Sequence, residues 1–252
     1  MARKSLVAAN WKMHKTISEA VKFVEELQKL VGSLDDREVL IVPPFTALHA
    51  VGNALNRGDF FLGAQNCFWE EKGAYTGEIS PVMLKDAGCS YVLVGHSERR
   101  NIFGETDEMI SKKVKALLRA GLSPVLCVGE KLEEREAGQT FQVVERQLKE
   151  GLLDIDVQSL AKIVIAYEPV WAIGTGKTAS PAQAQEVHTF IRSTIEKISG
   201  DKSVAEGLRI LYGGSVKPDN VDELMKEPDI DGLLVGGASL EVSSFKRIIE
   251  YR

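Results

Sequence analysis

The sequence predicts an α/β protein built as a (β/α)₈ barrel, with eight parallel strands and its active site at their C-terminal face. Short apolar segments recur eight times along the 252 residues. Most are continuous rather than alternating, as in parallel strands buried on both faces. Segments with helical periodicity separate them, so strand and helix alternate throughout. Eight units in 252 residues leave about 31 residues for each, which is the size of a barrel unit.

The element boundaries follow from local signals along the chain. The expected strands span residues 5–10, 38–42, 60–65, 90–95, 123–128, 162–167, 208–213 and 231–237. The clearest helices span residues 18–31, 106–121 and 180–198. Ser18, Thr106 and Ser180 stand at their N-cap positions, Pro181 takes a first helical position, and Gly121 stands where a C-cap would.

We expect one domain over residues 1–252. An open, doubly wound sheet is the alternative. It is less favoured because such sheets usually have fewer strands, and because no Pro/Gly/Ser-rich linker divides the chain into halves.

Composition excludes some functions and leaves others open. The net charge is -5 and no basic run stands out, so nucleic acid and membrane surfaces are not expected partners. A small anion remains compatible, since helix N-termini and one lysine suffice for a phosphate. Cys67, Cys89 and Cys127 form no close pair, and the N-terminus has no signal-peptide apolar segment. We therefore expect a cytoplasmic protein without disulfides.

In a barrel, the active site lies where the strands end. Polar residues and glycines stand at or just after the ends of six expected strands: Asn10 and Lys12, His96 and Glu98, Glu130, Glu168, Ser215, and Gly236 and Gly237. These positions are the candidate site.

Glu168 ends a buried strand, and Pro169 holds it in extended geometry. It is our candidate base, although a structural salt bridge is the alternative at such a position. The segment 170–180 that follows is apolar in its first half and contains two glycines, which is typical of a lid that excludes water when closed.

Two glycine motifs compete for the same lid residues. Gly176, Lys177 and Thr178 resemble the end of a P-loop, but Trp171 stands where its first glycine belongs. Gly174, Gly176 and Ala179 fit a dinucleotide-binding pattern. That match is weak, because six residues separate strand from motif and the acidic Glu196 lies within a helix.

Gly-Gly pairs stand at the ends of the last two strands, and each is expected to open into a helix beginning with a small hydroxyl residue. Paired tight turns are one interpretation. A phosphate site is favoured, because glycine lets backbone N–H groups approach an anion and barrels often bind phosphate here.

His96 precedes an expected short helix, whose N-terminus favours the neutral ring. His14, His49 and His188 are interpreted as packing or surface residues. Lys12 needs an anionic partner at the end of an apolar strand, which Glu98 or a bound phosphate would supply. No residues have metal-ligand spacing, so no metal is expected.

Seven segments, in order along the chain, together carry a resemblance to the triosephosphate isomerase family: ANWKMH, AYTGE, GHSERR, CVGE, AYEPVWAIGTGK, YGGSVKPDN and DGLLVGGASL. The resemblance implies cofactor-free interconversion of dihydroxyacetone phosphate and D-glyceraldehyde 3-phosphate, a step of glycolysis and gluconeogenesis, through an enediolate.

The resemblance also implies individual roles. Glu168 would be the base, His96 the neutral electrophile, and Lys12 and Asn10 the partners of enediolate and phosphate. Gly174, Ser215, Gly236 and Gly237 would bind the phosphate, and Tyr212 and Ser215 would latch the closed lid. The supporting residues would be Glu98, Ser97, Cys127, Glu130 and Tyr212.

Residues 65–78 form a long expected loop with the aromatic residues Phe68, Trp69 and Tyr75, which a monomer would hardly expose. This loop resembles the family's dimer loop. It implies a homodimer in which Thr76 approaches the neighbour's site near Lys12 and Met13.

Three other functions remain as alternatives. A different barrel enzyme for a phosphorylated sugar would not require VGHSERR together with EPVWAIGTGK. A nicotinamide oxidoreductase depends on the weak glycine motif. An inactive binding scaffold would keep the phosphate glycines and lose the base, which the presence of Glu168, His96 and Lys12 opposes.

Overall fold

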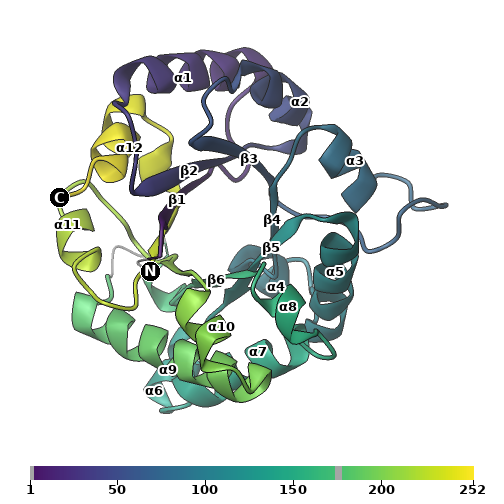
Figure 1. The fold of residues 1–252 in the computed structure, drawn as a ribbon, viewed down its shortest axis with the longest axis vertical. Coiled ribbons are helices and arrows are strands. Elements are labelled where there is room, and N and C mark those ends of the chain that lie inside the picture. The colour runs from purple at the N-terminus through teal and green to yellow at the C-terminus, as the bar shows by residue number, and fades with distance from the viewer. Residues whose placement is uncertain (1–2, 174–177) are drawn as a thin grey trace.

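Eight parallel strands close into a barrel, and helices surround it (Figure 1). The computed structural model describes residues 3–173 and 178–252. The strands follow one another around the barrel in chain order, and the last pairs with the first. They are β1 (Ser5–Asn10), β2 (Arg37–Val42), β3 (Phe60–Ala64), β4 (Tyr91–Val94), β5 (Ser123–Val128), β6 (Val164–Tyr167), β7 (Ile210–Tyr212) and β8 (Gly232–Val235). The predicted (β/α)₈ barrel is confirmed, and the open sheet is wrong.

Helices form the outer layer of the molecule (Figure 1). Their bounds are α1 (Ile17–Leu30), α2 (Phe45–Ala54), α3 (Pro81–Asp86), α4 (Ser97–Asn101), α5 (Asp107–Ala120), α6 (Leu132–Glu136), α7 (Thr140–Gly151), α8 (Val157–Leu160), α9 (Pro181–Ser199), α10 (Lys202–Gly207), α11 (Val221–Leu224) and α12 (Val242–Ile249). Short 3₁₀ turns are η1 (Val170–Ala172) and η2 (Gly237–Ser239). No helix in the described part of the chain is both long and apolar enough to cross a membrane.

Most of the predicted helix ends are confirmed. The side chains of Thr106 and Ser180 accept backbone N–H bonds as N-caps of α5 and α9, and Pro181 opens α9. Gly121 ends α5 in the left-handed region, at φ 76°, where glycine avoids the strain that a Cβ would bring.

The predicted N-cap at Ser18 is wrong, because α1 begins earlier, after Thr16. The Glu19 carboxylate accepts the backbone N–H of Thr16 at 2.7 Å. Thr16 and Glu19 have capping-box spacing, and this pairing fixes the start of the helix before Ser18 is reached.

The barrel interior explains why polar side chains reach its mouth. Alternate strand residues pack against one another inside the barrel: Leu6, Ala8, Leu40, Val42, Tyr91, Leu93, Val125, Cys127, Val164, Ala166, Leu211 and Leu234. Side chains two apart on a strand share a face. Asn10 therefore continues the inward row of Leu6 and Ala8, and Glu168 continues that of Val164 and Ala166.

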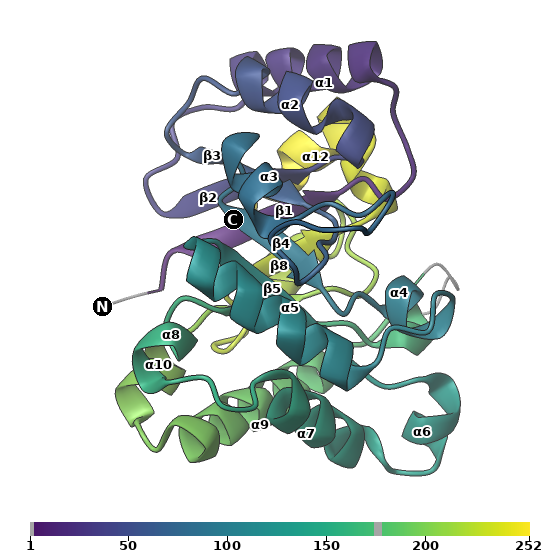
Figure 2. The same ribbon diagram turned by 90° about the vertical axis from the view of Figure 1, so that its right-hand side faces the viewer.

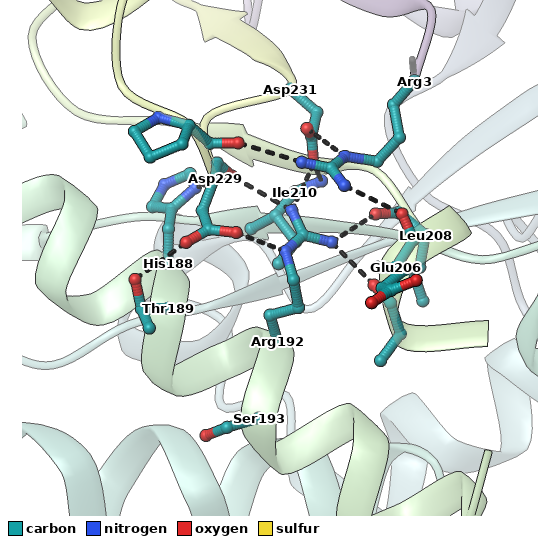
Figure 3. Close-up of polar contacts among 12 residues, drawn as sticks. Arg3, His188, Thr189, Arg192, Ser193, Glu206, Leu208, Ile210, Asp229 and Asp231 are labelled. Atoms are coloured by element: carbon teal, nitrogen blue, oxygen red, sulfur yellow. Dashed lines mark hydrogen bonds and ion pairs between the residues drawn. The ribbon is translucent and has the colours of Figure 1, made fainter. Parts of the chain in front are cut away.

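Two arginines join α9, the end of α10 and the segment just before β8 at the opposite end of the barrel (Figure 3). Arg192 pairs with Asp229 at 2.5 Å and with Asp231 at 2.7 Å. Its guanidinium also donates to the carbonyl of Leu208 at 3.0 Å. Arg3 reaches the other oxygen of Asp231 at 2.5 Å. The Arg192 and Asp231 side chains are only 12% and 5% exposed, so solvent screens this pair little.

Arg192→Met is expected to lower the free energy of unfolding by about 3–5 kcal/mol, because it leaves the buried Asp231 carboxylate and the half-buried Asp229 carboxylate short of a cation. Urea unfolding at neutral pH would measure the loss. Arg119→Met on the exposed surface of α5 is the matched control, expected to stay within about 0.5 kcal/mol of the parent. Equal stability of the two variants would contradict this account of the cluster.

The histidines outside the site are packing or surface residues, as predicted. His14 and His49 are exposed, whereas His188 is fully buried. Its Nδ1 lies 3.0 Å from the carbonyl oxygen of Asp229, which fits a neutral ring donating from Nδ1. Burial lowers the pKa of His188 to about 4.

This lowered pKa predicts a pH dependence of stability. In the unfolded state the pKa of His188 is near 6.5. Between about pH 6.5 and pH 4, this histidine therefore binds a proton more readily in the unfolded state than in the folded state. Stability from His188 is therefore present above pH 6.5 and is lost as pH falls, by up to about 3 kcal/mol. Urea unfolding of the parent and of His188→Gln at pH 7 and pH 4.5 would test this. Lowering the pH should reduce the free energy of unfolding of the parent more than that of the variant. A difference that is the same at both pH values would refute this.

Candidate active site

A cavity of about 340 Å³ lies at the C-terminal ends of the strands and collects most of the predicted residues. In Figure 2 the barrel is seen from the side, with α4 and α6 toward this end, on the right, and α8 and α10 toward the opposite end, on the left. The predicted residues that line the cavity are Asn10, Lys12, His96, Glu168, Ser215, Gly236 and Gly237. Gly174 lies outside the described residues. A larger cavity of about 500 Å³ lies beside Glu168, among Arg100, Arg146 and Gln147. The smaller cavity holds the predicted chemistry, so we assign the site to it.

Glu168 is 2% exposed and has hydrogen-bond partners on both carboxylate oxygens. The Ser97 N–H donates to Oε2 at 2.9 Å, and His96 Nε2 lies 2.9 Å from Oε1. Burial by itself works to raise the pKa of this carboxyl. The adjacent His96 ring and Ser97 N–H outweigh burial and leave the pKa below its ordinary value. The group is therefore a carboxylate at neutral pH, as a base must be.

His96 caps α4, and this fixes the form of its ring. The Glu98 N–H donates to Nδ1 at 3.2 Å, so Nδ1 carries no proton and Nε2–H is the donor toward Glu168. Burial works to lower the pKa of His96, but the Glu168 carboxylate opposes it and leaves this pKa raised while the two groups touch. Movement of Glu168 away from the ring would remove that effect. The Glu98 N–H would then keep the ring neutral with Nε2–H facing the cavity.

Lys12 is held in an uncommon backbone conformation, with φ at 51°. Its N–H donates to Asn10 Oδ1 at 3.1 Å, and its carbonyl accepts from Gln65 Nε2 at 2.8 Å. Its ammonium pairs with Glu98 Oε1 at 2.7 Å, the partner that the sequence predicts. Left-handed geometry in a lysine costs free energy and is typical of functional positions.

The two Gly-Gly pairs face the same cavity but differ in structure. Gly237 opens η2, so its N–H has no partner within that helix. The helix predicted to begin at Ser215 is wrong, because α11 begins only at Val221. Asn220 explains the delay, since its side chain accepts the Lys217 N–H at 2.8 Å and donates to the Ser215 carbonyl at 3.0 Å, which holds this segment as a loop.

Close packing requires glycine beside the base. A Cβ at Gly213 would lie 3.0 Å from Glu168 Cγ, and one at Gly214 would collide with the Tyr212 hydroxyl. The Gly213 N–H donates to the Tyr167 carbonyl at 2.7 Å. These glycines therefore keep the end of β7 against the end of β6.

Glu130 anchors the start of the predicted lid. It is fully buried, and it accepts hydrogen bonds from Trp171 Nε1 at 2.9 Å and from the Tyr167 hydroxyl at 3.1 Å. Arg135 pairs with it at 3.2 Å. The apolar residues 170–173 are buried or half-buried here. Cys127 lies in the barrel interior and is fully buried, which raises the pKa of its thiol.

Comparison with known proteins agrees with this geometry. The profile of the family described as "Triosephosphate isomerase" matches residues 5–252. Proteins named triosephosphate isomerase from Syntrophotalea carbinolica and Endomicrobium trichonymphae are 55% and 57% identical to the chain, over 99% of each sequence. One from Roseiflexus is 55% identical over 99% of this chain and 98% of its own. The chain belongs to the triosephosphate isomerase family.

For this triosephosphate isomerase family member, sequence reasoning missed several residues of the site. Ile173 and Leu234 line the cavity, but apolar side chains in a strand or lid give no signal of a ligand. Gln65 supports the Lys12 backbone, although the sequence places it only at the start of a loop. Among residues 3–173 and 178–252, no group of three or more His, Cys, Asp or Glu side chains is arranged to hold a metal ion.

The loop that resembles the family's dimer loop folds around its own aromatic residues. The Phe68 ring stacks on Trp69 with centroids 4.0 Å apart and lies 4.5 Å from Tyr75. Thr76 is exposed, and Tyr75 remains 45% exposed. Near the site, Met13 is 93% exposed.

Proposed function

We propose that this chain interconverts dihydroxyacetone phosphate and D-glyceraldehyde 3-phosphate through an enediolate. The observation that carries the proposal is one cavity that unites a buried carboxylate, a histidine donor and a lysine with two Gly-Gly pairs. Membership of the triosephosphate isomerase family supports the same activity.

In this proposal, Glu168 removes the proton next to the substrate carbonyl. Its carboxylate is ionised, and both oxygens are engaged with Ser97 and His96. It has to turn from these donors toward the substrate. Leaving them removes the groups that lower its pKa, so the carboxylate becomes a stronger base as it approaches the substrate carbon.

His96 and Lys12 stabilise the negative charge that develops on the substrate oxygen. A neutral His96 donates from Nε2, and the Lys12 ammonium provides a positive charge in the same cavity. Fixed donors aimed at a developing oxyanion supply a large part of the rate enhancement in such sites. This enzyme is itself a standard example of a glutamate base beside a neutral histidine under a closing loop.

The phosphate binds at the glycine pairs in this scheme. Ser215, Gly236 and Gly237 contribute backbone N–H groups, Lys12 and Asn10 contribute side chains, and Gly174 joins them when the lid closes. Tyr212 and Ser215 latch the closed lid, which protects the enediolate from losing phosphate. Ser97, Glu98, Cys127 and Glu130 support these groups.

The reaction moves a proton and changes no net oxidation state of the substrate, so we propose that it runs without cofactor or metal. We also propose a cytoplasmic location and one domain over residues 1–252. The described cysteines, Cys67, Cys89 and Cys127, are buried and free, which suits a reducing compartment.

A homodimer is part of the proposal. Met13, Phe45 and Phe103 line a recess of about 220 Å³ next to Lys12 and His96. Exposed apolar side chains around one recess are typical of an interface. Thr76 of a partner subunit would approach the site there. Sedimentation velocity at micromolar concentration should give a dimer, and a fully active monomer would refute this.

A coupled assay tests the activity directly. The purified chain is expected to convert D-glyceraldehyde 3-phosphate and dihydroxyacetone phosphate in both directions, with pentose phosphates turned over far more slowly. Turnover of a pentose phosphate without triose phosphate turnover would instead favour a different barrel enzyme for a phosphorylated sugar.

A further inference from the structure

Gln147 lies outside the 340 Å³ cavity assigned as the site, yet its side chain is hydrogen-bonded to the backbone that follows β5, beside the base. It comes from α7, which packs between α5 and α9 in the outer layer. It is 5% exposed. The Gly129 N–H donates to its Oε1 at 2.7 Å, and its Nε2 donates to the Gly129 carbonyl at 3.2 Å. One amide thus satisfies both polar groups of one backbone residue.

Gly129 in turn lies directly against the backbone of Glu168. A Cβ at position 129 would collide with the Glu168 carbonyl. Hydrogen bonds on either side hold the two segments together, from the Glu168 N–H to the Val128 carbonyl at 2.8 Å and from the Val170 N–H to the Glu130 carbonyl at 3.1 Å. The position of Gly129 therefore sets the position of the Glu168 main chain.

The rest of the sheet does not fix Gly129 in this way. β5 ends at Val128, and its register with β4 stops at the pair Val94 and Leu126. The bonds to β6 use the carbonyls of Val128 and Glu130. The Gly129 N–H and carbonyl are both hydrogen-bonded to the Gln147 amide, and half-buried backbone groups without a partner would cost free energy.

We propose that Gln147 is a positioning residue for the catalytic base: it fixes the Gly129 backbone, and through it the Glu168 backbone. The proposal rests on the function proposed above. It differs from a role in binding, because Gln147 does not line the cavity with Lys12 and the glycine pairs. Loss of the Gln147 amide should make the position of Glu168 less fixed and leave the phosphate-binding residues in place.

Gln147→Met tests this, since it keeps the length of the side chain and removes both hydrogen bonds. Displacement of the base should lower kcat by about 10-fold and leave KM within about twofold. Proton transfer should become more rate-limiting. The isotope effect on kcat, measured with glyceraldehyde 3-phosphate deuterated at C2, should therefore rise above that of the parent. Gln142→Met, an exposed position on the same helix, is the matched control and should match the parent.

Gln147→Glu keeps the length and the acceptor but loses the donor at pH 8, and a smaller loss of kcat is expected. If Gln147→Met does not fold, the kcat and isotope effect of Gln147→Glu test the proposal in its place. Parent-like kcat in the folded variant, or a reduced kcat with an unchanged isotope effect, would overturn the proposal. An inactive parent chain would instead reject the proposed function, so the two failures are distinguishable.

Discussion

Glu168→Asp is expected to lower kcat by about 100-fold and to leave KM within a few-fold. The substitution keeps the charge and removes one methylene, which withdraws the carboxylate by roughly 1 Å from the carbon it attacks. The substitution does not touch the phosphate-binding N–H groups of Ser215, Gly236 and Gly237, so substrate binding should persist. Steady-state kinetics in the coupled assay would separate the two constants.

Glu25→Asp, at an exposed position of α1, makes the same chemical change far from the site and should leave both constants unchanged. A Glu168→Asp enzyme with parent-like kcat would show that this carboxylate is a structural partner of His96. The 2.9 Å contact between the two side chains would then be the structural salt bridge that the sequence offers as the alternative.

Lys12→Ala is expected to lower kcat/KM by about 10³-fold or more. Lys12 lines the cavity together with Asn10 and His96, where its ammonium can act on both the phosphate and the developing oxyanion, so KM should rise as kcat falls. The change also leaves Glu98, now 2.7 Å from the lysine, without that partner and with its negative charge near the incoming anion.

Lys22→Ala, exposed on α1, removes the same charge without touching the cavity. It should behave as the parent. A Lys12→Ala enzyme with raised KM and unchanged kcat would restrict this lysine to phosphate binding and remove it from oxyanion stabilisation.

The barrel and the place of its site could be predicted because both depend on periodicity. Continuous apolar strands that alternate with helices leave few other arrangements, and parallel strands bring their C-terminal ends together. Asn10 and Glu168 each lie two residues beyond an inward-facing residue of their strand. Because every second side chain of a strand faces the barrel interior, both side chains reach the same cavity. The pairing of Lys12 with Glu98 follows from the cost of an unpaired charge.

What the sequence could not predict depends on side chains that come from distant elements. Gln147 occupies a buried position of α7. Helical periodicity predicts only that this position is buried, and it does not indicate the hydrogen bonds to Gly129. The left-handed backbone of Lys12 depends on a hydrogen bond from Gln65, fifty-three residues away. At Ser215, the Asn220 side chain overrides the local helix signal, which shows tertiary and loop contacts prevailing over propensity.

The central claim is that Glu168 removes a proton from one substrate carbon, which forms an enediolate, and that a proton is then delivered to the neighbouring carbon. Conversion of D-glyceraldehyde 3-phosphate in D₂O, followed by NMR, tests it most directly. The account predicts solvent deuterium at C1 of the dihydroxyacetone phosphate formed, and Glu168→Asp should slow product formation and deuterium incorporation together. Rapid conversion with no deuterium in the product would indicate direct hydride transfer between the two carbons and would contradict the account.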